Sequence, residues 1–315
     1  MKKIIRIVKW TGLSLLLIIC AICIAVPLRQ HLKFDAPYPD IHASKDSAVI
    51  ARGRHLVISA AHCVDCHGNG NQDSMMKLGK DVPLSGGYAF ELPLGNVYAK
   101  NITPDIETGI GKRTDPELAR VLRYGVHANG DAVFNFMPFQ HTSDEDLRAI
   151  ISYLRSTAPV KNQVPDHQLN ALGQSIRAFM VKPVGPTEPV PVSVKPDTTA
   201  AYGKYLVFSV ANCRGCHTQR QLSGEYTGPL LAGGNPMGEK ELELAPPNLT
   251  TDSSSRIFGW SKEKFIGRFR EGKKIEFSHM PWESYNRMTN DELTAIYNYL
   301  QTVPAAKIVT PAKGK

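Results

Sequence analysis

Cysteine is scarce in this chain of 315 residues, which contains only six. Four of them lie in two five-residue clusters, 63–67 and 213–217, and the other two, Cys20 and Cys23, lie in an apolar run near the N-terminus. Because no cysteine is left elsewhere, we do not expect a disulfide framework that joins distant segments. A second Cys-x-x-Cys is also missing near each cluster, which argues against a four-ligand zinc site.

The chain has little clustered positive charge outside its N-terminus. Its formal net charge is +8, and Lys2, Lys3, Arg6 and Lys9 contribute four of the positive charges. No Lys/Arg-rich run follows, so we do not expect a nucleic-acid partner. Hydrophobic residues make up 42% and charged residues 21%, which is typical of a globular protein and argues against disorder.

Charge is absent from Trp10 to Leu28, a run of nineteen residues. As a helix this run would span roughly 28 Å, close to the ~30 Å of a bilayer core. The basic residues before it predict a cytoplasmic N-terminus and an exported remainder. A cleaved signal sequence is the alternative, but no clear Ala-x-Ala site follows the run. We therefore predict a membrane anchor at residues 1–30, in which Cys20 and Cys23 are ordinary apolar residues.

The chain contains an internal repeat. Residues 51–67 align with residues 201–217, and nine of the seventeen positions are identical. The likeness continues in three later pairs of segments: NITPD (101–105) and NLTTD (248–252), FNFMPF (134–139) and FSHMPW (277–282), and SDEDLRAIISYL (143–154) and TNDELTAIYNYL (289–300). Such self-similarity indicates two copies of one structural unit.

The repeat defines the predicted domains. We place the first copy, called the first half, at residues 47–165, and the second copy, the second half, at residues 199–306. Residues 31–46 link the anchor to the first half, and residues 307–315 form a short tail. Residues 166–198 link the halves, and the five prolines in 183–196 predict an extended, stiff spacer.

Each half is predicted to be mostly helical. Leu56, Val57 and Ala60 recur at helical spacing ahead of the first cluster. Thr-x-x-Glu and related capping patterns mark the starts of a middle and a last helix in each half, at Thr114, Ser143, Ser261 and Thr289. No sustained strand alternation is visible. Gly53 and Gly203 are expected to allow close packing against the last helices, near Tyr153 and Tyr299.

The two clusters read CVDCH and CRGCH. In Cys-x-x-Cys-His the side chains at i, i+3 and i+4 share one face of a helical turn, so two thiols and an imidazole can reach one flat cofactor. This pattern is the attachment signature of c-type haem, in which the thiols form thioethers and the imidazole binds iron. The sequence therefore predicts two haem c groups, held by Cys63, Cys66 and His67 in the first half and by Cys213, Cys216 and His217 in the second.

The clusters have three alternative explanations, namely a disulfide, a zinc site and a chance occurrence. Disulfides within Cys-x-x-Cys are usually redox-active, and neither half resembles a thioredoxin βαβ unit. A zinc site lacks further ligands at matching spacing. Chance is implausible, because the cluster recurs within a matching helix.

The second axial ligand of each iron should occur in both halves. Met137 lies 70 residues after His67, and Met280 lies 63 residues after His217. Both stand in Met-Pro pairs flanked by aromatic residues, just before the last helix. A thioether favours Fe(II), so His/Met ligation raises the reduction potential. The alternative is that both are ordinary core methionines.

These motifs resemble class I cytochromes c, twice over. NITPDIETGIG, followed by a helix, a Met-Pro loop and SDEDL, is similar to the membrane-bound cytochrome c subunits of bacterial periplasmic alcohol, gluconate and nicotinate dehydrogenases. The resemblance covers residues 47–305 and implies a transmembrane helix followed by two tandem class I cytochrome c domains. Such subunits commonly carry three haem domains, whereas this chain has two Cys-x-x-Cys-His clusters.

The resemblance implies an electron-transfer role in the respiratory chain. The anchor would hold the chain in the bacterial inner membrane with its haem domains in the periplasm. Electrons would come from a dehydrogenase catalytic subunit and pass to ubiquinone or a terminal oxidase, and the chain would not be an enzyme on its own. Alternatives are a dihaem enzyme, such as a cytochrome c peroxidase or thiosulfate dehydrogenase, and a haem-containing sensor. An enzyme would need an open distal site or a distal cysteine, and a sensor would need a signalling domain.

Overall fold

The computed structural model describes residues 2–308, except 69, 71, 138, 222–223, 238–243 and 276. Up to residue 165 the described chain forms α1 (Lys2–Arg29), α2 (Ser47–Ile58), α3 (Cys63–His67), α4 (Gln72–Lys77), β1 (Ala89–Leu92), β2 (Gly95–Tyr98), α5 (Asp115–Tyr124) and α6 (Asp144–Ser156). It continues with β3 (Gln168–Leu169), α7 (Ala171–Phe179), α8 (Ala200–Tyr205), the π-helix η1 (Leu206–Val210), α9 (Cys213–His217), α10 (Lys262–Arg270), α11 (Trp282–Tyr285) and α12 (Asn290–Leu300).

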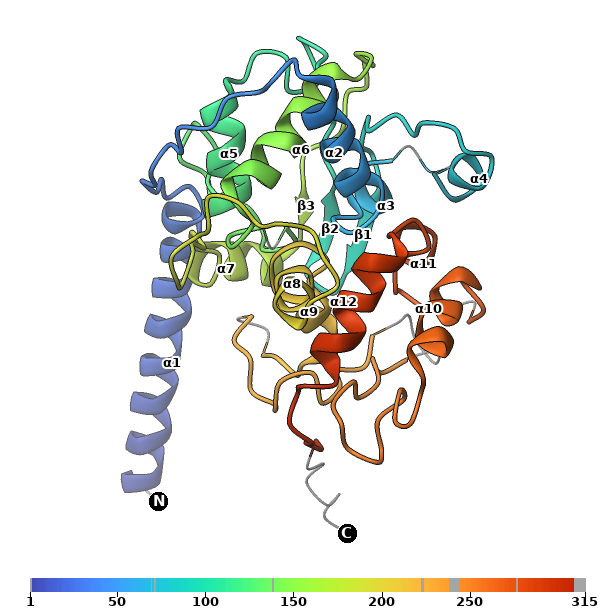
Figure 1. Ribbon diagram of the computed structural model, residues 1–315. Coiled ribbons are helices and arrows are strands. Elements are labelled where there is room, and N and C mark those ends of the chain that lie inside the picture. Colours follow the sequence, from blue (N-terminus) through green and yellow to red (C-terminus); the bar gives the residue numbers. More distant parts are fainter. Residues whose placement is uncertain are drawn as a thin grey trace.

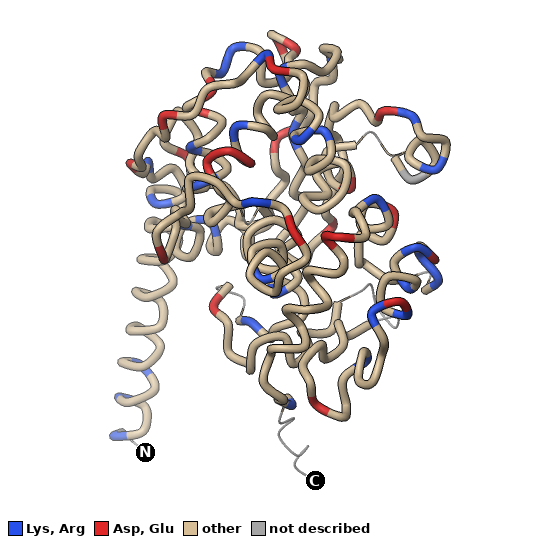
Figure 2. The backbone as a smooth tube through the Cα atoms, in the orientation of Figure 1, with Lys and Arg blue, Asp and Glu red and all other residues tan. Residues whose placement is uncertain are grey.

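Helix α1 projects from the globular part of the molecule (Figure 1). Its stretch Lys3–Arg29 contains an 18-residue window with a mean hydropathy of 2.6 and is long enough to cross a membrane. These properties agree with the predicted anchor, and a signal sequence would share them. Figure 2 shows the contrast with the globular part, over which acidic and basic residues are interspersed.

The two halves repeat the same order of helices. Helix α2 corresponds to α8 and η1, α3 to α9, α5 to α10, and α6 to α12. The first and last helices of each half pack closely, because a Cβ atom at Gly53 would collide with the carbonyl oxygen of Ala149, and one at Gly203 would collide with that of Ala295. The expected role of the two glycines is confirmed.

The predicted helix starts are confirmed by their caps. Thr114 and Thr289 each form a capping box with the glutamate three residues later. Ser143 and Ser261 each accept a hydrogen bond from the backbone N–H three residues later. These side chains satisfy N–H groups that have no partner within the helix, which fixes where each helix begins.

The described chain is mostly helical, as predicted, and it also contains a small sheet that no strand alternation had indicated. Strands β1 and β2 form an antiparallel hairpin in which Leu92 pairs with Gly95, and β3 adds to β2. The strands have four, four and two residues. Segments this short do not produce a readable alternation of apolar and polar residues.

Part of the predicted linker 166–198 also has regular structure. It contains β3 and α7, and the Asn170 side chain caps α7 by accepting a hydrogen bond from the Gly173 N–H. Residues 183–196, all of them described, contain no helix or strand, as their prolines predicted. The first half therefore gains a strand and a neighbouring helix from the segment that follows it.

The two halves share one hydrophobic core. A continuous cluster of buried side chains includes Leu56 and Val57 of α2, Leu206 of η1 and Leu293 of α12. The sequence predicted the apolar helix faces but not their fusion into one core.

Candidate haem-binding sites

Both clusters lie on short helices that begin after a left-handed residue. His62 precedes α3 with φ of 39°, and Asn212 precedes α9 with φ of 49°. These residues turn the chain out of the preceding helix and into the cluster. Within each five-residue helix the two thiols and the imidazole lie on one turn, and all of the cysteines are free. The arrangement has the geometry that attachment of one planar cofactor needs.

The two imidazoles are oriented in the same way. His67 Nδ1 lies 2.7 Å from the carbonyl oxygen of Lys100, and His217 Nδ1 lies 2.8 Å from that of Pro247. A carbonyl can only accept, so Nδ1 must be the donor and Nε2 keeps its lone pair. This hydrogen bond from Nδ1 fixes the orientation of the ring and raises the basicity of Nε2, the nitrogen that would bind a metal.

The NITPD and NLTTD segments hold the two carbonyl groups in place. Asn101 follows Lys100 and donates through Nδ2 to the carbonyl oxygen of Val160 at 2.8 Å. Asn248 follows Pro247 and donates in the same way to Ala306 at 2.8 Å. In both segments the asparagine Oδ1 accepts from the backbone N–H two residues later. The sequence reading used the segment only as a mark of resemblance and missed this supporting role, although its recurrence was visible.

Burial keeps the polar groups of the clusters neutral. It lowers the pKa values of His67 and His217, which favours the unprotonated imidazole that a metal requires. It raises the pKa of the Cys63 and Cys213 thiols to about 12 and that of Cys66 to about 11. Such surroundings suit a thioether sulfur, which carries no charge. The donor set therefore fits haem attachment.

The predicted methionine ligands lie in comparable surroundings. Met137 and Met280 are half-buried and pack against the same core as Cys63 and Cys213. In the second half, Ser278 Oγ accepts hydrogen bonds from the Met280 backbone N–H at 3.3 Å and from Trp282 Nε1 at 3.0 Å. Pro138, the residue after Met137, lies outside the described residues. Iron ligation by the two methionines stays a prediction.

The residues of α11 connect the two clusters. The rings of His62 and Tyr285 meet edge to face, with centroids 5.5 Å apart. The Tyr285 hydroxyl donates to the carbonyl oxygen of Ala211 at 2.6 Å, and Ser284 Oγ donates to Asp65 Oδ2 at 2.7 Å. One short helix of the second half thus touches the cluster of the first half and the chain that leads into its own.

Ion pairs and hydrogen bonds also cross between the halves. His55 Nε2 lies 2.9 Å from the Glu292 carboxylate, while the Tyr205 hydroxyl donates to Asp146 at 2.8 Å. His55 and Tyr205 occupy equivalent positions in the repeat, as do Asp146 and Glu292. Burial opposes ionisation of Glu292, but its contacts with His55 and Arg52 hold its pKa below the ordinary value. The first helix of each half is therefore paired with the last helix of the other.

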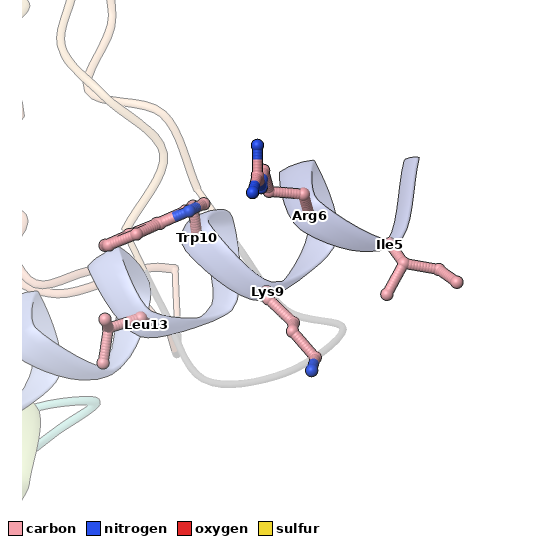
Figure 3. Close-up of a pocket in the computed structure, with 5 residues that line it drawn as sticks. All are labelled: Ile5, Arg6, Lys9, Trp10 and Leu13. Atoms are coloured by element: carbon pink, nitrogen blue, oxygen red, sulfur yellow. The ribbon is translucent and has the colours of Figure 1, made fainter. Parts of the chain in front are cut away.

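Other possible sites were sought among the described residues. Within residues 2–308, less the gaps given above, no three His, Cys, Asp or Glu side chains gather as they would around a metal ion. A hollow of about 410 Å³ lies on α1, lined by Ile5, Arg6, Lys9, Trp10 and Leu13 (Figure 3). It belongs to the basic start of the predicted anchor and contains none of the predicted site residues.

Known proteins share these features. Residues 200–304 match the family model for cytochrome c. The chain is 29% identical to the fructose dehydrogenase cytochrome subunit of Gluconobacter japonicus, over 84% of this chain and 54% of that one. It is 28% identical to the gluconate 2-dehydrogenase cytochrome c subunit of Pantoea cypripedii, over 82% and 60%. It is also 25% identical to a diheme cytochrome c-type protein of Cereibacter sphaeroides, over 78% and 83%.

These findings confirm the resemblance inferred from the motifs. The chain spans a little more than half the length of the first two relatives, so their substrates and partners do not transfer to it directly.

Proposed function

We propose that this chain, which contains a cytochrome c domain and is related to the cytochrome c subunits of bacterial dehydrogenases, transfers electrons through two covalently bound haems. When bound, each haem supplies an iron centre that gains and loses one electron. The residues that would hold the two groups are Cys63, Cys66, His67 and Met137 in the first half, and Cys213, Cys216, His217 and Met280 in the second. We propose accordingly that each half is a class I cytochrome c domain.

The repeated orientation of the two imidazoles carries this proposal. His67 and His217 each donate through Nδ1 to a backbone carbonyl, and each of these carbonyls is fixed by the asparagine that follows it. A histidine with only a packing role would not need its free nitrogen aimed from the same turn as two thiols in both halves. The arrangement prepares a metal ligand at each site before any metal binds.

The protein's own groups set the conditions for electron transfer. The neutral imidazole and thioether ligands add no charge to the iron site, so they stabilise Fe(II) relative to Fe(III). The apolar core around Cys63 and Cys213 limits the entry of water. A site that keeps the same ligands and little water in both oxidation states needs little rearrangement when an electron arrives.

The location and partners follow from the anchor and the relatives. We propose that α1 stays uncleaved in the bacterial inner membrane and holds the globular part in the periplasm. The donor would be the catalytic subunit of a dehydrogenase, as the names of the relatives indicate. The acceptor would be ubiquinone or a terminal oxidase, and the chain alone would not turn over substrate.

Haem counting tests the proposal. We expect two haems per full-length chain purified from membranes, measured by pyridine haemochrome absorbance and intact mass. Cys63→Ser with Cys66→Ser should remove one, and Cys213→Ser with Cys216→Ser should remove the other. The matched control is the pair Cys20→Ser and Cys23→Ser in α1, which changes another Cys-x-x-Cys and should leave both haems in place.

A second measurement tests the electron-transfer role. Substrate should reduce the haems only when the dehydrogenase subunit that co-purifies with the chain is present. Substrate turnover by the isolated chain would contradict the proposal, and so would a full-length chain that carries no covalent haem.

A further inference from the structure

The two clusters differ where the first one contacts the second half. At the position before the first cysteine, the first half has His62 and the second has Asn212, and before the second cysteine they have Asp65 and Gly215. His62 packs against Tyr285 of α11, and Asp65 accepts a hydrogen bond from Ser284 of α11. Two of the differences between the repeats therefore lie on one contact surface.

The second cluster uses the same two positions within itself. A Cβ atom at Gly215 would collide with the side-chain amide of Asn212. Asn212 and Gly215 thus fit each other closely and leave no room for an aspartate. In the second cluster the residues at these two positions contact each other, whereas in the first cluster both side chains contact α11.

Helix α11 lies in a segment that is longer in the second half. Nine positions separate Met280 from the cap at Thr289, whereas six separate Met137 from the cap at Ser143. Figure 1 shows α11 beside α3, at the upper end of α12. The extra residues therefore bring a helix to the junction that has no counterpart in the described part of the segment 137–143.

Two further contacts from α4 hold this element in place. Glu283 of α11 forms an ion pair with Lys77 at 3.5 Å, and Arg287, just after α11, donates to the carbonyl oxygen of Met76. Tyr285 is only 5% exposed. The first half therefore contacts α11 from α3 and from α4, and Tyr285 of α11 is buried.

We propose that α11 is the electron-exchange junction between the two haem sites, and that Tyr285 positions it. Tyr285 meets His62, the residue before Cys63, and it donates to Ala211, which stands two residues before Cys213. This gives a route of covalent bonds, one ring contact and one hydrogen bond from cluster to cluster. Electron tunnelling weakens less along bonded atoms and hydrogen bonds than across empty space, so this route couples the sites.

The step balances as a one-electron exchange. With a haem at each cluster, one electron would leave the Fe(II) site of one half and enter the Fe(III) site of the other. Tyr285 would be neither oxidised nor deprotonated, because the electron passes from iron to iron and the hydroxyl only donates its hydrogen bond to Ala211. This inference rests on the proposed function, since it requires a haem at each cluster.

Flash reduction of the fully oxidised, full-length protein tests the junction. Transfer between the two sites appears as an absorbance phase whose rate does not depend on protein concentration. Tyr285→Leu removes the ring and the hydroxyl and should slow this phase by about tenfold. Tyr285→Phe keeps the ring contact and should slow it by about threefold.

Tyr297→Phe is the matched control. The Tyr297 hydroxyl also donates to a backbone carbonyl, that of Trp260, at 2.9 Å, but within the second half. Its removal should leave the phase unchanged. If Tyr285→Leu does not fold, Tyr285→Phe and Asp65→Asn still probe the junction, because Asp65→Asn weakens the contact with Ser284.

The outcomes separate the junction from the proposed function. Variants that keep two haems and normal spectra but exchange electrons at the unaltered rate would overturn the junction and leave the electron-transfer role intact. A missing exchange phase in the unaltered two-haem protein would overturn it as well. Failure of the unaltered protein to bind two haems would instead contradict the proposed function.

Discussion

The methionine loops of the two halves have the same pattern but different neighbours. In the first half, Phe136 stands before Met137, is 46% exposed and stacks on Phe90 with centroids 5.2 Å apart. In the second half, Trp282 follows Met280 and lies under the guanidinium of Arg268, which is 3.6 Å from the ring centroid. An aromatic ring therefore stacks on the residue before one predicted ligand, whereas a cation stacks on the tryptophan two residues after the other.

Two sites with the same predicted ligands can therefore differ in reduction potential. A positive charge near an iron site disfavours the more positive Fe(III) state and so raises the reduction potential. We therefore expect the site of the second half to have the higher potential. Substitutions can change either a feature that both halves share or a feature that distinguishes them.

The shared helix crossing should be the most sensitive feature. Gly53→Val and Gly203→Val each place a side chain against a backbone carbonyl and should each cost at least about 3 kcal/mol of unfolding free energy. Urea unfolding followed by circular dichroism measures this cost. Gly267→Ala in α10 is the control, because a Cβ there meets no atom and should stabilise the protein by up to about 1 kcal/mol. Equal stability of all three variants would refute the close crossing.

The ligand assignment can be tested in each half separately. Met137→Ala and Met280→Ala should each remove about half of the weak absorption at roughly 700 nm that Met–Fe(III) haem gives, and each should lower one potential. Met288→Leu is a control, since Met288 is buried in the core and should not contribute to the band. An unchanged band in either alanine variant would show that the ligand of that half is misassigned.

The stacked cation should separate the two potentials. Arg268→Gln removes the charge over Trp282 and should lower the potential of the second half only, which brings the two values closer together. Spectroelectrochemical titration measures both potentials. Arg54→Gln is a control for the loss of one arginine charge elsewhere, because Arg54 pairs with Asp81 on the first half. An equal shift of both potentials would contradict the assignment.

The ion pair between His55 and Glu292, which joins the two halves, should make the free energy of unfolding depend on pH. The pKa of Glu292 is held below its ordinary value of about 4.3, so the carboxylate stabilises the fold above that pH. This stability is lost as the pH falls through the lowered pKa. Glu292→Gln should flatten the acid limb of the stability curve measured by thermal unfolding, whereas Glu145→Gln, at an exposed position, should not. An unchanged acid limb in Glu292→Gln would exclude this contribution.

The helix caps should give the smallest and most nearly equal effects. Thr114→Ala and Thr289→Ala each remove a capping box and should each cost about 1 kcal/mol in urea unfolding. Serine at either position keeps the hydroxyl and should restore most of the stability. A larger loss at Thr289 than at Thr114 would show that the cap next to Glu292 also supports the contact between the halves.

Local signals explain which parts of the structure could be predicted. The caps at Thr114 and Thr289 depend on a side chain and a backbone three residues away, so the sequence alone was sufficient. The contact of His67 with Lys100 joins residues 33 positions apart, and no local pattern announces it. The same limit hid the role of α11, whose contacts include residues of the other half of the chain.

Other features that were not predicted do have a signal in the sequence, but their segments are too short for that signal to be clear. Asn170 followed by Gly173 is a capping pattern for α7, but the prolines that follow drew attention to an extended linker. The hairpin offered Gly95, whose φ of 108° requires a glycine, yet its strands are too short for periodicity. Haem attachment at the clusters rests on a contiguous pattern, Cys-x-x-Cys-His, and ligation by Met137 and Met280 rests on spacing; both stay predictions.

The crossed pairing of His55 with Glu292 and Tyr205 with Asp146 has a consequence for the symmetry of the chain. Equivalent residues that exchange partners across an interface are the mark of a two-fold symmetric dimer. The two halves therefore have the arrangement of a two-fold symmetric homodimer within one polypeptide. Identical subunits must change together, but copies within one chain can differ from each other. His62 and Asp65 are such differences, since they contact α11 from one side only.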